Sequence, residues 1–432
     1  MLSHELANRF RSASWPKAAA AVVVGFIVLG FAIDLASHNE DYQLDLRTYY
    51  LAGKAFEAGL NPYDLEALSS VGQASVERPF VYPLWSLPLL GRISSLSFET
   101  VYFAFLALKF LLLPVLFILW RRTVLEELGF RFVLFALMVF NAAIYVDLRV
   151  GNVSIFEQVM IWAAFYQLLK RRPVAFSVLI VLASSLKLTP LLFLGLLLLE
   201  DRSKMLQCGL IAAGLLLMIH GLPLLLGGSL ARDYLSALNG LGERGVVNPT
   251  VLALLQDGSD WVGGLMGVEI PGIIDIALTG LIGALVLLAS WRAIRTMGEE
   301  DWSVRARYVL LLACFAYALI LPRFKTYSYI LIIPSSYSAL MNLFPAASGP
   351  NAFARLVRDS IMSGVVGLSS LYAISLGSEG LGRSLLGYSP LMVALCAWAL
   401  QLGGEKFGAR LQSTWIRADL RPANDVGGLS HG

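Results

Sequence analysis

Long apolar stretches dominate this sequence and limit the folds that it can adopt. A helix needs about 20 mostly apolar residues to cross a membrane. Runs of about that length occur at roughly 18–36, 98–120, 128–147, 152–169, 205–227, 272–294, 305–321, 327–344, 359–376 and 386–403. Only 15% of the 432 residues are charged, against about a quarter in an ordinary soluble domain. The sequence therefore predicts an all-α integral membrane protein built as a polytopic helical bundle.

The stretch from 173 to 199 is too long for one membrane span and too short for two complete ones. Basic residues flank it on both sides, with Lys170 to Arg172 before it and Arg202 and Lys204 after it. Because such clusters are retained in the cytoplasm, an even number of crossings must lie between them. We expect a hairpin of two short helices, each about 12 to 14 residues long, with its bend near Lys187.

The run from 81 to 95 contains two prolines and an arginine. If it crossed the membrane, every later basic cluster would lie on the outer side, against the tendency of such clusters to stay in the cytoplasm. We predict a re-entrant or interfacial segment instead, which gives about 12 transmembrane helices with both chain ends inside. A transmembrane domain is then expected over 1–403 and a partly disordered cytoplasmic tail over 404–432. Two long segments, 37–80 and 228–271, face outward.

The first outer segment has a helical pattern of its own. After Asp45, its apolar residues keep helical spacing, which predicts a short amphipathic helix on the membrane surface. Asp45 is expected to cap the start of this helix, and Gly59 to end it in the left-handed conformation. Capping alone would explain Asp45, but a carboxylate at a helix start can also face a cavity.

Several different short motifs lie one after another along the outer segments and at helix ends. They are Asp45-Leu-Arg-Thr-Tyr49-Tyr50, Gly59-Leu-Asn61-Pro62-Tyr63-Asp64, Phe80-Val-Tyr82-Pro83, Gly151-Asn152, Ser185-Leu-Lys187-Leu-Thr-Pro190, Asn248-Pro-Thr and Pro322-Arg323. Over about residues 20 to 345, this order resembles the polyprenol-phosphate-dependent glycosyltransferases of family 87, in the GT-C superfamily. The sequence departs from the family pattern at Leu84, where a second proline is usual, and lacks a histidine near 323–329.

The resemblance implies a GT-C type bundle whose outer loops carry short amphipathic helices. It also implies an enzyme that moves a sugar, expected to be mannose, from a polyprenyl-phosphate carrier to an acceptor hydroxyl. The acceptor would be a glycolipid or lipid-linked glycan on the outer face, and the anomeric centre would be inverted. The implied location is the bacterial inner membrane, with the site facing the periplasm or cell exterior.

Asp45 matches the family's catalytic acidic residue. An acceptor hydroxyl is a weak nucleophile, so one carboxylate must take its proton. A lipid phosphate can act as the leaving group without an obligatory metal ion if fixed cations stabilise its negative charge. We therefore expect no cofactor, although Glu40 and Asp41 leave weak binding of a divalent metal as an alternative.

The candidate substrate-binding residues lie in the outer loops and at helix ends or breaks. They are Lys187, Arg323, Lys325, Arg149, Tyr49, Tyr50, Tyr82, Asn152 and Asn248. Lys187, on the bend between two short helices, is expected to bind the donor phosphate because a cation there is costly, and extension to the membrane interface is the alternative.

Each of the other assignments has a structural alternative. Arg323 and Lys325 would either bind phosphate or extend to the membrane interface. Arg149 would otherwise pair with Asp147, and the tyrosines would otherwise anchor the interface.

Two other functional classes fit parts of the sequence. A secondary transporter or lipid flippase would also contain broken helices and an intramembrane lysine. The sequence shows no inverted repeat and carries a long outer loop with an aspartate, which favours the enzyme. A non-catalytic membrane partner of a polysaccharide machine remains a further alternative. Scattered basic residues and a formal charge of only +3 argue against nucleic acid as a partner.

Overall fold

The computed structural model describes residues 22–38, 42–73, 75–76, 78–125, 129–239, 242–297, 301–342, 352–371 and 386–403. These residues form helices, turns and connecting segments and include no strand, which confirms the all-α prediction. The predicted tail over 404–432 lies outside them, as do the basic residues before position 22.

Among the described residues, five helices are long and apolar enough to cross a membrane. They are α5 (Phe98–Thr123), α6 (Phe130–Val150), the continuous helix of α9, η3 and α10 (Arg202–Leu226), α13 (Gly272–Thr296) and α14 (Trp302–Ile320). Shorter apolar helices cover Val22–Ser37, Pro173–Leu186, Thr189–Leu199, Ser360–Ser369 and Ser389–Leu402. The polytopic character is thus confirmed for the described residues, whereas the number of 12 crossings stays a prediction.

The remaining elements are shorter. They are α2 (Leu44–Glu57), α3 (Leu65–Gly72), η1 (Leu84–Ser86), α4 (Leu87–Ser94), α7 (Ser154–Leu169), α8 (Pro173–Leu186), η2 (Thr189–Leu199), α11 (Gly228–Asn239), η4 (Gly245–Val247), α12 (Val251–Met266), η5 (Thr326–Ile332), α15 (Ile333–Asn342), α16 (Ala352–Ser369) and α19 (Ser389–Leu402). The predicted span at 327–344 therefore begins as a 3₁₀ helix and continues as α15.

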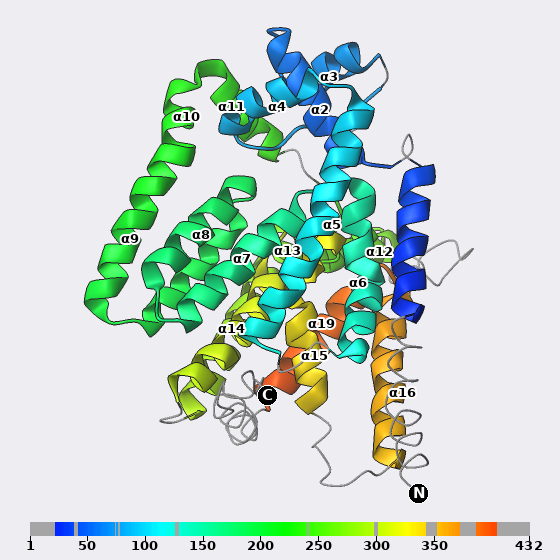
Figure 1. Ribbon diagram of the computed structural model, residues 1–432, viewed down its shortest axis with the longest axis vertical. Coiled ribbons are helices and arrows are strands. Elements are labelled where there is room, and N and C mark those ends of the chain that lie inside the picture. Colours follow the sequence, from blue (N-terminus) through cyan, green and yellow to red (C-terminus); the bar gives the residue numbers. More distant parts are fainter. Residues whose placement is uncertain are drawn as a thin grey trace, which may run out of the picture.

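Helices α2, α3, α4 and α11 gather at one end of the bundle, at the top of Figure 1. We call this group the cap. Helix α5 starts directly after α4 and runs away from the cap, so Arg121 and Arg122 lie at the opposite end. The α9–α10 helix starts at Arg202 and ends beside α11. These basic clusters therefore lie at the same end of the bundle, opposite the cap, as the sequence predicted.

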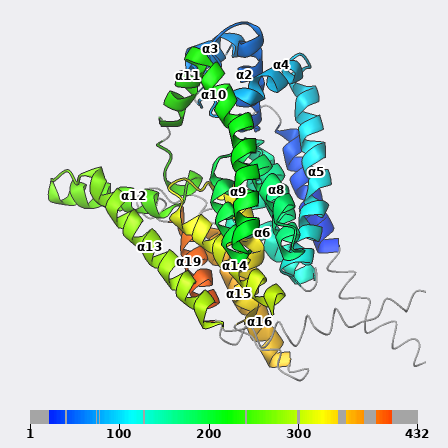
Figure 2. The ribbon, with the colours of Figure 1, turned by 90° about the vertical axis from the view of Figure 1, so that its left-hand side faces the viewer.

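Two helices at the periphery expose apolar side chains. Leu210 and Leu225 of the α9–α10 helix are 75% and 74% exposed, and Ile273 of α13 is 68% exposed. Figure 2 shows α12 and α13 leaning away from the rest of the bundle. Apolar faces of this kind suit contact with lipid, because surrounding lipid tails are as apolar as the side chains.

The two unusual segments of the sequence behave as expected. Helix α8 ends at Leu186, Lys187 has an extended backbone (φ −147°, ψ 136°), and the chain continues as the 3₁₀ helix η2. The predicted bend at Lys187 is therefore confirmed. In the segment 81–95, helix α4 has only eight residues, about 12 Å at 1.5 Å per residue, which is too short to cross a membrane.

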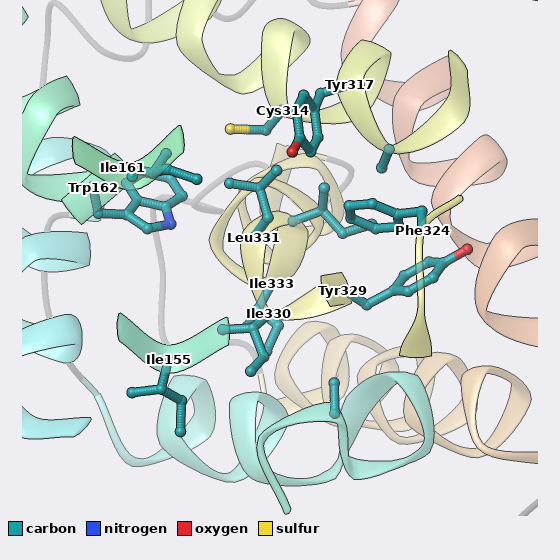
Figure 3. Close-up of a cluster of buried hydrophobic side chains, with 14 of the residues drawn as sticks. Ile155, Ile161, Trp162, Cys314, Tyr317, Phe324, Tyr329, Ile330, Leu331 and Ile333 are labelled. Carbon is teal, nitrogen blue, oxygen red and sulfur yellow. The ribbon is translucent and has the colours of Figure 1, made fainter. Parts of the chain in front are cut away.

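A cluster of buried apolar side chains lies below the cap and supports the segment after α14. Figure 3 shows Tyr317 of α14 beside Phe324 of that segment, with Tyr329 next to Phe324 and Trp162 of α7 on the other side of the cluster. The Phe324 and Tyr329 rings make an edge contact with centroids 4.9 Å apart, and both side chains are buried. This packing fixes the backbone just beside Arg323 and Lys325.

Candidate active site

The start of α2 is held by the end of α6 rather than by a capping carboxylate. Gln43, in the left-handed conformation (φ 63°), precedes the helix, and its backbone N–H donates to the Arg149 carbonyl at 2.8 Å. Its side-chain Nε2 donates to the Leu148 carbonyl at 2.5 Å. Gly151 (φ 71°) allows this approach, because a Cβ there would overlap the Gln43 side chain.

The prediction that Asp45 caps α2 is therefore wrong. Asp45 lies inside the first turn, so its carboxylate is free to face the cavity. At the other end of α2, Gly59 has φ 71° and the Leu60 N–H donates to the Ala55 carbonyl at 2.8 Å. This is the predicted left-handed end of the helix.

The Asp45 carboxylate has two side-chain partners. Asn152 Nδ2 donates to its Oδ2 at 2.6 Å, and Arg78 Nη1 lies 3.3 Å from its Oδ1. The Asp45 side chain is 11% exposed, so it is largely withdrawn from water. A carboxylate in this setting has a fixed direction and can still reach a ligand.

Three tyrosine hydroxyls lie around the side-chain amide of Asn152. The hydroxyls of Tyr49 and Tyr82 are 2.6 Å apart, and Asn152 Nδ2 lies 3.2 Å from the first and 3.3 Å from the second. The Tyr327 hydroxyl accepts from Asn152 at 3.0 Å. Burial, together with the nearby Asp45 carboxylate, raises the pKa of Tyr49 and of Tyr82 well above the usual value, so both keep their protons.

These groups line a cavity of about 510 Å³ between the cap and the bundle. That volume falls within the usual range for small-molecule sites, about 300 to 1,000 Å³. Among the described residues, its charged lining comprises three carboxylates and four cations, a net formal charge of +1. They are Asp45, Glu157, Glu243, Arg78, Lys187, Arg323 and Lys325.

Lys187 lines the cavity, as predicted, but it has partners within the protein. Its Nζ donates to Ser154 Oγ at 2.6 Å and to Glu157 Oε2 at 2.9 Å. Lys187 therefore has partners within the protein, whereas its predicted contact with the donor phosphate stays a prediction. The sequence did not reveal this pair because Glu157 lies on α7, thirty residues earlier.

Arg323 and Lys325 lie together on another wall of the cavity. Arg323 Nη2 and Lys325 Nζ both contact the Glu243 carboxylate, at 2.8 Å and 2.7 Å. Burial would raise the pKa of Glu243, but the two cations outweigh it and hold that pKa below the usual range. Burial lowers the pKa of Lys325, although the Asp45 and Glu243 carboxylates oppose this. One carboxylate thus compensates two cations.

Asn248 holds this wall in place and is not part of the cavity lining. Its Oδ1 accepts the Phe324 N–H at 2.8 Å, and its Nδ2 donates to the Glu243 carbonyl at 3.1 Å. The side chain therefore joins the loop of Glu243 to the segment of Arg323 and Lys325.

Two predicted binding residues lie away from the cavity. Arg149 stacks on the Tyr42 ring, with its guanidinium carbon 4.3 Å from the centroid. Asp147, its predicted alternative partner, is instead paired with Lys109 at 2.8 Å, and both of these side chains are fully buried. The Tyr50 hydroxyl donates to the Leu96 carbonyl and so fastens α2 to the loop before α5.

Other lining residues were not among the predicted site residues. Arg78 and Glu243 lie in loops, where charged residues are common and carry no special signal. Glu157 stands inside an apolar run, and a charge there is a signal that sequence reasoning could have used. Gln158 is 2% exposed, and its buried Oε1 has no hydrogen-bond partner among the described residues.

Within the described residues, no group of three or more His, Cys, Asp or Glu side chains could hold a metal ion. Glu40 and Asp41, named above only as alternative weak metal ligands, lie outside the described residues. The expectation that no cofactor is needed stays a prediction.

Comparison with known proteins identifies the chain's family. The family model for glycosyltransferase family 87 matches residues 80–322, more than half of the chain. This span includes Asn152, Lys187 and Asn248, whereas Asp45 precedes it and Lys325 follows it. No curated protein and no solved structure matches the chain. The extent of the family match shows that the chain belongs to glycosyltransferase family 87.

Proposed function

We propose that this membrane glycosyltransferase takes its sugar from a polyprenyl-phosphate carrier and passes it to an acceptor hydroxyl with inversion. The observation that carries this proposal is the Asp45 carboxylate in a cavity whose described lining residues have a net formal charge of +1. A sugar-phosphate diester carries a single negative charge, which complements the cavity. The carbohydrate transferred is proposed to be mannose.

In the proposed reaction, Asp45 accepts the proton of the acceptor hydroxyl as its oxygen attacks the anomeric carbon. The bond between that carbon and the phosphate oxygen breaks on the opposite side. The products are the glycosylated acceptor and a polyprenyl phosphate monoester. Negative charge therefore increases at the phosphate during the step, and fixed cations stabilise that increase more than they stabilise the ground state.

Arg323 and Lys325 suit the phosphate best. Each forms an ion pair with Glu243, but this single carboxylate cannot neutralise both, so one positive charge remains for a ligand. The burial that lowers the pKa of Lys325 also makes its charge costly without further anionic partners. The hydroxyls of Tyr49 and Tyr82 then lie near the transferred sugar, beside Asp45.

The proposed acceptor is a glycolipid or lipid-linked glycan on the outer face of a bacterial inner membrane. Support comes from the cap, which holds Asp45 at the end of the bundle opposite Arg121, Arg122 and Arg202. Labelling of single cysteines in intact cells tests this orientation. A cysteine at 64 should react with an impermeant reagent and one at 204 should not; the reverse pattern would place the site on the cytoplasmic side.

A reconstituted assay separates the enzyme from the transporter alternative. Purified protein in vesicles would receive a polyprenyl-phosphate donor that carries radiolabelled mannose, together with a membrane glycolipid extract as acceptor. We expect label in a new glycolipid and release of free polyprenyl phosphate. Movement of intact donor between leaflets, without product, would instead support a flippase.

A further inference from the structure

A continuous series of buried and partly buried hydrogen bonds connects Asp45 to Glu157. The series runs through Asn152, Ser154 and Lys187. Glu157 Oε2 is 2.9 Å from Lys187 Nζ, which is 2.6 Å from Ser154 Oγ. Ser154 Oγ is 2.9 Å from Asn152 Oδ1, and Asn152 Nδ2 is 2.6 Å from Asp45 Oδ2.

The chemistry of the groups fixes the direction of every bond in this series. An ammonium can only donate, so Ser154 Oγ must accept from Lys187. Ser154 is fully buried, and its single hydroxyl proton therefore points to the remaining neighbour, Asn152 Oδ1. Because Oδ1 accepts, the NH₂ group of Asn152 must face Asp45. The ammonium of Lys187, acting through Ser154, therefore requires the same orientation of the carboxamide as the Asp45 carboxylate does.

We infer that Lys187 is a positioning residue, which acts through Ser154 to hold Asn152 in the orientation that aims Asp45. This inference rests on the proposed role of Asp45 as the base. Glu157 supports Lys187, because it is the counter-charge that keeps an ammonium on a lysine only 22% exposed. Lys187 therefore has a different task from Lys325, although both line the same cavity.

The orientation of Asn152 matters because a reversed carboxamide would place an oxygen against the Asp45 carboxylate. Two acceptors would then face each other without a proton between them, and the carboxylate would turn away. Its distance from the acceptor hydroxyl would change, and a displacement of about 1 Å can reduce a rate about a hundredfold. Donor binding at Arg323 and Lys325 would be unaffected.

The decisive experiment measures turnover and donor affinity on the same purified variants. Ser154→Ala and Lys187→Met should each lower kcat by at least about tenfold, while the Kd for the polyprenyl-phosphate sugar changes less than about twofold. Lys187→Arg should recover part of the lost kcat because it keeps the charge. Ser177→Ala is the matched control: Ser177 is also a fully buried helical serine, bonded only to the Pro173 carbonyl, and its loss should leave kcat unchanged.

The opposite pattern of effects on kcat and on donor Kd would overturn the inference. If Lys187→Met weakened donor binding tenfold or more while Ser154→Ala kept wild-type kcat, Lys187 would bind the phosphate directly. Equal kcat in all variants would likewise remove the positioning role, yet it would leave the proposed transfer reaction intact.

A measurement that does not depend on transfer separates this inference from the proposed function. Thermal unfolding of Ser154→Ala, Asn152→Ala and the double variant tests whether these side chains act together. We expect the double variant to lose clearly less stability than the sum of the single losses. Additive losses would show that the series is not connected, whether or not the wild type transfers a sugar.

Discussion

Two walls of the same cavity use similar residues in different ways. The Asp45 wall consists of Asp45, Asn152, Ser154, Lys187 and Glu157, and each ammonium or hydroxyl on it has a defined protein partner. The Glu243 wall consists of Glu243, Arg323 and Lys325, where one carboxylate serves two cations. On the first wall, Lys187 balances Glu157, and Arg78 pairs with the remaining carboxylate, Asp45. The second wall retains a positive charge.

This difference shows that a cation in a membrane cavity is not by itself a ligand site. Lys187 has a carboxylate of its own and is best suited to fix the direction of other groups. Arg323 and Lys325 share theirs, so an incoming anion would complete their neutralisation. Net charge within hydrogen-bond distance, rather than the presence of a lysine, distinguishes the two roles.

The largest expected effect is on the Asp45 wall. Asp45→Asn should reduce transfer by a hundredfold or more, since an amide cannot take the hydroxyl proton. Donor binding should persist, because the phosphate cations are unchanged. Asp64→Asn is the matched control: Asp64 caps α3 from the same outer segment, and asparagine caps a helix about as well. Near wild-type turnover by the Asp45→Asn enzyme would return Asp45 to a structural role.

On the Glu243 wall, the expected effect is on affinity. Lys325→Met should weaken binding of the polyprenyl-phosphate sugar by one to two orders of magnitude, since a charge-assisted bond is worth roughly 1.5 to 3 kcal/mol. Titration of the purified variant with the donor lipid would measure this change. An unaltered Kd would mean that the phosphate binds elsewhere.

The paired glutamates provide a direct contrast in stability. Glu157→Gln leaves a buried ammonium without a counter-charge and should lower the melting temperature by several degrees. Glu243→Gln should lower it less, because the Glu243 side chain is 27% exposed, against 4% for Glu157, so water screens its ion pairs more. Equal decreases in melting temperature would show that the two glutamates contribute equally to stability.

The pH dependence of the Glu243 wall has a defined sign. The two cations hold the pKa of Glu243 below its usual range, so its ionised form stabilises the fold at neutral pH. That contribution is lost as the pH falls below the usual glutamate range. The stability difference between wild type and Glu243→Gln should therefore narrow in acid, and unfolding at several pH values would detect it.

The smallest effect distinguishes two adjacent tyrosines. Tyr49→Phe removes a hydroxyl that bonds Tyr82 and Asn152, and should lower kcat by a few-fold to about tenfold. Tyr50→Phe removes a bond to the Leu96 carbonyl and should reduce stability with little change in kcat. Comparable kcat losses in the two variants would contradict the placement of Tyr49 beside the reacting groups.

Much of the architecture could be predicted from hydropathy and charge, because membrane helices must form their backbone hydrogen bonds within each segment. The bend at Lys187 and the short α4 followed from run length and proline positions. The partners of Lys187 and Arg149 could not be predicted in this way, because Glu157 is distant in sequence from Lys187 and Tyr42 is distant from Arg149. The Lys109–Asp147 pair lies in two apolar runs, where each charge was visible but its partner was not. Pairing across helices depends on packing, which residue order alone does not specify.

The most direct test of this account is a structure of the protein with a bound polyprenyl phosphate. We predict that the phosphate lies within hydrogen-bond distance of both Arg323 and Lys325, in the cavity that contains Asp45, while Lys187 keeps its bonds to Ser154 and Glu157. A phosphate bound to Lys187 with the Glu157 pair broken, or bound outside this cavity, would contradict the account.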